Sequence, residues 1–63
     1  MKVYLRNGDQ LVLDGGAKCS DAAAAISEGL ARSAVAAKVN GVLCDLSHKL
    51  AEGDKVEIVT LKD

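Results

Sequence analysis

The sequence has no phenylalanine and no tryptophan, and Tyr4 is its single aromatic residue. A core built from this chain must therefore be aliphatic, with each buried side chain contributing roughly 1.5–3 kcal/mol. Its 63 residues make at most one domain. They leave no space for a deep cavity, because a ligand pocket of about 300 Å³ or more would consume the core. We expect the core to be formed by Val3, Leu5, Leu11, Leu13, Ile26, Leu30, Val39, Leu43, Leu46, Leu50, Val56 and Ile58.

An excess of charge of one sign is also missing. The formal net charge is −1, and the basic residues are scattered among acidic ones without a basic run. A strong electrostatic footprint for nucleic acid is therefore absent. Lys38 and Lys49 are the candidates for a local contact with phosphate or with a partner. Tyr4 is the only side chain that could stack on a base.

Long apolar runs and metal-binding cysteine patterns are lacking as well. No segment approaches the length of about 20 apolar residues that a membrane-spanning helix needs, and no apolar signal region opens the chain, so we expect no membrane partner and a cytoplasmic setting. Cys19 and Cys44 form no zinc pattern, since His48 is the only other soft ligand. We expect two free thiols, with Cys19 buried and Cys44 more accessible.

No catalytic constellation is present. Ser47 and His48 are neighbours in sequence, which does not make a triad. The Gly15-Gly16 pair lacks the Gly-Lys-Ser/Thr ending of a phosphate loop. We therefore predict no catalytic, cofactor-binding or metal-ligating residue in this chain and no enzymatic activity of its own.

The first half of the chain predicts a hairpin followed by a helix. Alternating apolar residues over 2–6 and 10–13 indicate two strands joined by a turn. An alanine-rich helix should begin at Ser20 or Asp21, since both side chains cap helices well. We expect it to end at Gly29 in a left-handed cap, followed by a further short helical turn.

The second half contains the strongest local signal, Asn40-Gly41. This pair favours a two-residue type I′ turn, which needs positive φ at both positions, so it is predicted to be a structural turn. It joins predicted strands over 34–40 and 42–45. In the second of these we expect Leu43 to face the core and Cys44 to face away.

A last strand is predicted over 55–61, with Val56 and Ile58 facing inward. The order of hairpin, helix, hairpin and strand indicates an α+β fold of the β-grasp, ubiquitin-like type. It would have a mixed sheet of about five strands and one main helix. In this topology residues 3–5 pair in parallel with residues 57–59.

Four stretches carry a family resemblance: Asp21–Ala31, Ala37–Gly41, Cys44–Leu46 and Val56–Thr60. With them, the sequence from residue 2 to residue 61 resembles a TGS domain, the β-grasp module shared by threonyl-tRNA synthetases, certain GTPases and stringent-response nucleotide synthetase/hydrolases. Within that family, Ile-Ser-x-Gly-Leu-Ala over 26–31 is similar to the threonyl-tRNA synthetase branch. The stringent-response branch usually has His where Ser27 and Glu28 stand. Two positions depart from the pattern, since Lys18 replaces a capping Thr and Cys19 replaces a Val.

The resemblance implies a single TGS domain over 1–63, excised from the N-terminus of a larger, oligomeric enzyme and itself monomeric. It would be a non-catalytic accessory module of a threonine–tRNA ligase, whose ATP and zinc belong to a separate catalytic domain. Its partners would be the rest of that polypeptide and, weakly, tRNA or a regulatory ligand. The alternative is a regulatory TGS module of a GTPase or of a stringent-response enzyme. A sulfur carrier is disfavoured, because the chain ends Thr-Leu-Lys-Asp rather than Gly-Gly.

Overall fold

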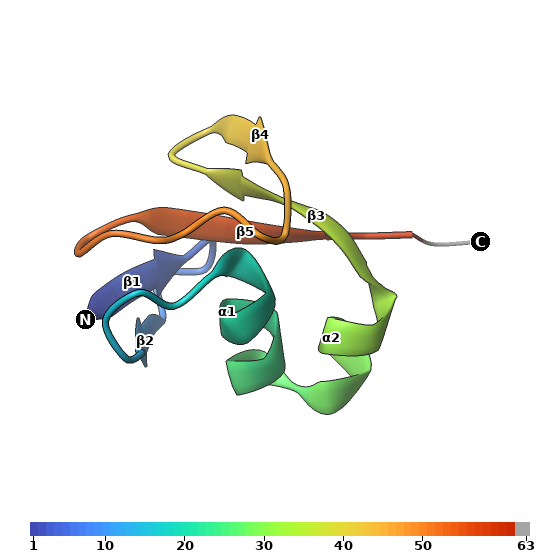
Figure 1. Ribbon diagram of the computed structural model, residues 1–63, viewed down its shortest axis with the longest axis horizontal. Coiled ribbons are helices and arrows are strands. Elements are labelled where there is room, and N and C mark those ends of the chain that lie inside the picture. Colours follow the sequence, from blue (N-terminus) through green and yellow to red (C-terminus); the bar gives the residue numbers. More distant parts are fainter. Residues whose placement is uncertain (62–63) are drawn as a thin grey trace.

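The computed structural model describes residues 1–61 and contains one mixed sheet with helices on one face. The strands lie in the order β2-β1-β5-β3-β4. Figure 1 shows α1 and α2 on the same side of this sheet. The predicted five-stranded α+β β-grasp fold is confirmed. The elements are β1 Lys2–Leu5, β2 Gln10–Val12, α1 Cys19–Ile26, α2 Glu28–Ser33, β3 Ala34–Val39, β4 Val42–Cys44 and β5 Lys55–Thr60.

The central pairing of β1 with β5 is parallel, as predicted, but its register differs. Tyr4 pairs with Lys55 and Leu5 with Val56, so the expected pairing of 3–5 with 57–59 is wrong. The loop before β5 fixes this register, because Gly53 donates to the carbonyl of Lys2 at 2.8 Å and Tyr4 donates to the carbonyl of Asp54 at 2.8 Å. β5 is therefore already aligned with β1 where it begins.

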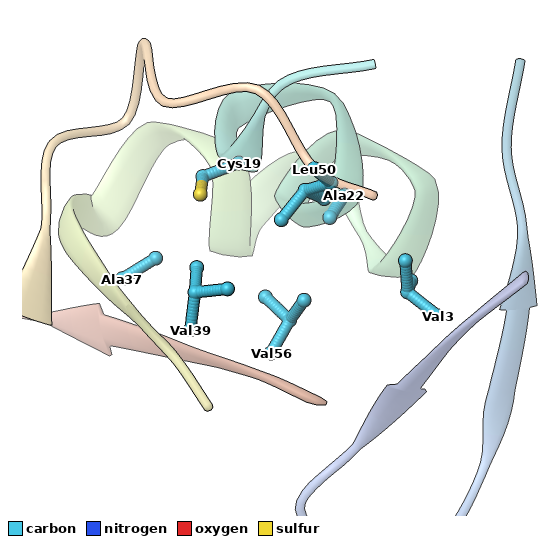
Figure 2. Close-up of a cluster of buried hydrophobic side chains, with 7 residues drawn as sticks. All are labelled: Val3, Cys19, Ala22, Ala37, Val39, Leu50 and Val56. Carbon is cyan, nitrogen blue, oxygen red and sulfur yellow. The ribbon is translucent and has the colours of Figure 1, made fainter. Parts of the chain in front are cut away.

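The core is made of small aliphatic side chains. Figure 2 shows Cys19 and Ala22 of α1 facing Val39 and Val56 of the sheet. The alanines allow the helix to approach the strands closely, and the largest fully buried side chains are two valines and Cys19. Two predicted core residues are exposed instead, Leu43 at 65 % and Ile26 at 38 %. The buried cluster is Val3, Cys19, Ala22, Ala37, Val39, Leu50 and Val56.

The predicted orientation of β4 is wrong, and the turn explains why. A two-residue turn places Val42 opposite Val39, Leu43 opposite Lys38 and Cys44 opposite Ala37. Directly opposed residues share a face of the sheet. Leu43 therefore joins Lys38 on the outer face, while Cys44 packs against the core beside the buried Ala37.

The turn itself has the backbone of its predicted type, with φ of 53° at Asn40 and 84° at Gly41. The Asn40 side chain also joins the turn to the start of β5. Its Nδ2 donates to Oδ1 of Asp54 at 3.0 Å, and its Oδ1 accepts from the N–H of Lys55 at 3.0 Å. An asparagine here therefore supplies both the left-handed conformation and a link between two loops.

The helix begins at Cys19, one to two residues earlier than predicted. Lys18 occupies the N-cap position, and its backbone N–H donates to Oδ2 of Asp21 at 2.8 Å. Lysine has no acceptor atom in its side chain, so only this half of a capping box forms. Ser20, expected as a cap, lies inside α1.

The predicted Gly29 cap is also wrong, because the helix is interrupted earlier, at Ser27. Ser27 is extended, with φ of −165°, and its Oγ accepts from the N–H of Leu30 at 2.9 Å. Serine is a strong N-cap, so it starts a second helix in which Gly29 takes an ordinary helical place.

Candidate binding face of the sheet

The helices cover one face of the sheet, and no element within residues 1–61 covers the other, here called the open face (Figure 1). Its residues alternate along each strand with those of the core. Strand pairing brings them together, since Tyr4 pairs with Lys55 and Lys38 pairs with Glu57. Side chains that are far apart in sequence are therefore neighbours on one surface.

A shallow hollow of about 440 Å³ lies on this face, here called the cationic hollow. Its charged residues are Arg6, Lys38, Lys55 and Glu57, so it carries a local excess of positive charge on a chain of net charge −1. It lies on the surface rather than inside the core. The hollow is lined by Tyr4, Leu5, Arg6, Gly8, Lys38, Gly41, Lys55, Val56 and Glu57.

The single acid in the hollow does not neutralise it. Nη1 of Arg6 lies 3.7 Å from Oε2 of Glu57, with the two side chains 81 % and 41 % exposed. Exposed ion pairs of this kind are worth little, on the order of 0–1 kcal/mol, so Arg6 stays available to another anion. Lys38 and Lys55 are exposed, and Tyr4, which lies on β1 beside Lys55, is half-buried.

This arrangement is suited to binding a ligand that combines an anionic group with a planar ring. Ammonium and guanidinium groups contact phosphate oxygens, and the face of a tyrosine ring stacks on a base or another planar group. Tyr4 lies on the open face between its strand partners Gln10 of β2 and Lys55 of β5. The hollow therefore offers an apolar surface bordered by exposed positive charge.

The other predicted contact residue, Lys49, lies elsewhere. It forms an isolated bridge with Lys18, in the loop that packs on the start of α1. The N–H of Cys19 donates to the carbonyl of His48 at 3.0 Å, and that of Ser20 to Leu46 at 3.0 Å. This loop therefore occupies helix amides that an anion would otherwise bind. The structure does not bring Lys49 and Lys38 to one face.

Two residues of the hollow were not among the predicted contacts, Arg6 and Lys55. The alternation of apolar and polar residues in the predicted strands 2–6 and 55–61 already directs Arg6 and Lys55 away from the core. Combining that alternation with the parallel pairing of the two strands would have placed them beside Tyr4.

The remaining reactive groups give no second site. Within residues 1–61, no group of three or more His, Cys, Asp or Glu side chains is placed to hold a metal ion. Cys19 is buried and Cys44 half-buried, and both are free thiols. Burial raises the pKa of the Cys19 thiol above its usual value of 9.0, with a smaller contribution from Cys44. No helix in this part of the chain has the length and apolar character to cross a bilayer.

Comparison with known proteins gives one consistent result. The sequence model of the TGS domain matches residues 1–60. The threonine–tRNA ligase of Geobacter sp. strain M21 is 48 % identical over 62 residues, which are 98 % of this chain and 10 % of that protein. The threonine–tRNA ligase of Thermus thermophilus is 48 % identical over 63 residues, again 10 % of its length. That of Deinococcus deserti is 44 % identical over the whole chain. The chain thus spans about a tenth of these relatives.

Proposed function

The chain belongs to the TGS domain family, and from that premise we propose that it is a non-catalytic accessory module of a threonyl-tRNA synthetase. The observation that carries this proposal is the 48 % identity to threonine–tRNA ligases over 98–100 % of the chain. The same identity favours a synthetase over a GTPase or a stringent-response enzyme. In this proposal residues 1–63 are an N-terminal domain of a larger cytoplasmic enzyme, which carries the ATP and zinc chemistry elsewhere.

The module's own contribution, in this proposal, is a weak contact with tRNA through the open face. Lys38, Arg6 and Lys55 meet backbone phosphates, and Tyr4 offers its ring to an exposed base. The net charge of −1 provides no attraction at long range. The contact therefore gains strength only when the rest of the enzyme holds tRNA nearby and raises its effective concentration.

The test compares two substitutions that remove the same charge from the full-length synthetase. Lys38→Gln alters the cationic hollow, whereas Lys49→Gln alters an exposed lysine in the loop against α1. Affinity for tRNA is measured between low and moderate salt concentrations. The slope of log K against log salt is negative, and each lost phosphate contact reduces its magnitude by about 0.7–0.9. We expect that reduction for Lys38→Gln and none for Lys49→Gln.

Two outcomes would contradict the proposal. If both variants and the unaltered enzyme have equal slopes, Lys38 of the open face does not contact tRNA phosphate. A reduced slope for Lys49→Gln alone would move the contact to the loop beside α1. Circular dichroism of each variant confirms that the fold is retained, which is expected because both side chains are exposed.

A further inference from the structure

The strand β5 is paired along only part of one edge. β3 lies along it from Val56 to Thr60, but the ladder with β1 contains only Tyr4–Lys55 and Leu5–Val56. β1 then leaves β5, because the chain turns back toward β2, and the N–H of Gly8 donates to the carbonyl of Leu5 at 3.0 Å. Figure 1 shows β5 continuing past β1 toward the end of the described chain.

The backbone of Ile58 points to this unpaired side. Hydrogen-bonded and non-hydrogen-bonded pairs alternate along an antiparallel ladder. The N–H of Asn40 donates to the carbonyl of Lys55 at 2.8 Å, which makes Lys38–Glu57 the next hydrogen-bonded pair. Ile58 then sits in a non-hydrogen-bonded pair with Ala37. Its N–H and C=O are therefore directed away from β3, beyond the last residue of β1.

An apolar groove of about 450 Å³ lies directly beside this edge. We call it the edge groove. Arg6, Asn7 and Glu57 border it, and its apolar lining residues are Leu5, Ile26, Leu30, Val56 and Ile58. Ile26 is 38 % exposed at the end of α1, and Leu30 and Ile58 are half-buried. The groove thus continues the line of β1, with a strand edge on one side and two helices beneath.

We propose that the edge groove binds an extended segment of the parent polypeptide, which adds to β5 as a β-strand in the place that β1 vacates. The N–H and C=O of Ile58 can pair with an extended backbone, and the groove beside them can accept apolar side chains from every second residue of that backbone. Four residues of β5, Glu57–Thr60, span roughly 13 Å, which matches a strand of four or five residues.

The choice of partner rests on the proposed function. Relatives of this chain are about ten times its length, so nine tenths of the parent polypeptide is available as a covalently tethered partner. Tethering raises the effective concentration into the millimolar range for short linkers, so a small edge of this kind can be occupied without high intrinsic affinity.

Amide hydrogen exchange measured by NMR tests the inference without using tRNA. In the 63-residue chain, the Ile58 amide should exchange about tenfold or more faster than that of Glu57, which donates to β3. In the full-length synthetase, the Ile58 amide should slow by about tenfold or more, while that of Glu57 changes little. Rapid exchange of Ile58 in both proteins would overturn the inference.

A matched pair of variants separates docking from a general change in stability. In the full-length protein, Ile26→Gln should restore rapid exchange at Ile58, because it places a polar side chain in the edge groove. Ala24→Gln, on an exposed position of the same helix, should leave Ile58 protected. Continued protection of Glu57 shows that each variant is folded.

Two further outcomes count against the inference. If Ile58 in the 63-residue chain becomes protected as concentration rises, together with a doubled mass by sedimentation, then a second copy of the chain is the occupant. Equal exchange at Ile58 in Ile26→Gln and Ala24→Gln would show that the groove does not hold the partner. Loss of the tRNA contact in the Lys38→Gln experiment leaves these results unaffected, so the two proposals fail separately.

Discussion

Alanine substitutions at two glycines isolate the backbone conformation that the Asn40-Gly41 turn requires. Gly41 has φ of 84°, while Gly29 lies in α2 with ordinary helical φ. A Cβ added at either position meets no other atom within 4 Å. Any difference between Gly41→Ala and Gly29→Ala therefore comes from φ and ψ, not from packing.

The two substitutions should change stability in opposite directions. A left-handed conformation costs an L-residue about 1–2 kcal/mol. Alanine also restricts the unfolded chain, which stabilises the folded state by about 0.4–1 kcal/mol. The free energy of unfolding of Gly41→Ala should therefore fall by about 1 kcal/mol. Gly29→Ala should gain up to about 1 kcal/mol, because alanine is the better helix former. For a domain of this size, each kcal/mol moves the melting midpoint by about 4–8 °C.

Urea unfolding followed by circular dichroism measures both free energies, and an unchanged m-value confirms that each variant unfolds from a state of the same compactness. The expected result is a separation of about 2 kcal/mol, with Gly29→Ala the more stable. Two variants of equal stability, or a Gly41→Ala variant more stable than the unaltered chain, would refute a positive-φ turn at this position.

Three further predictions concern the thiols, the core and the isolated chain. Because burial raises the pKa of the Cys19 thiol above 9.0, the folded chain keeps a proton that the unfolded chain loses, so stability should fall as pH rises above about 9. Cys19→Val should abolish that fall in urea titrations at about pH 8 and about pH 10; a fall that persists would contradict it. Leu50→Ala should cost about 2–5 kcal/mol, whereas Leu43→Ala should stay within about 0.5 kcal/mol, since Leu50 is 6 % and Leu43 65 % exposed. Equal losses in thermal melts would mean that Leu43 packs in the core. The purified chain should neither aminoacylate tRNA nor hydrolyse ATP, and turnover that a substitution within it abolishes would reveal a missed site.

The sequence predicted those features that depend on one local pattern. Asn-Gly specified its turn because few residue pairs tolerate positive φ twice. Val39 was predicted in the core, and the structure buries it. The predicted orientation of Leu43 was wrong because it was based on the hydrophobicity of that residue alone. The two-residue turn had already fixed which face each residue of β4 occupies, and tertiary register outweighs the preference of one side chain.

Features that depend on competing caps or on distant segments were harder to predict. The sequence suggested that the helix ends at Gly29. In the structure Ser27, two residues earlier, caps a second helix, because its Oγ accepts a hydrogen bond from the N–H of Leu30. The cationic hollow combines residues from three strands. Of its three basic residues, only Lys38 was predicted as a contact. Arg6 and Lys55 are recognised as its neighbours only after β1, β5 and β3 are placed side by side.

The small size of the domain has a consequence for calorimetry. At about 12–15 cal/mol/K per residue, 63 residues give a heat-capacity change of only about 0.8–0.9 kcal/mol/K, and an unfolding entropy of roughly 130 cal/mol/K near 60 °C. The melting transition should therefore be broad and easily displaced. An interface that contributes about 1 kcal/mol would raise the midpoint by about 7–8 °C. The melting midpoint of this domain should therefore report sensitively whether a binding partner is in place.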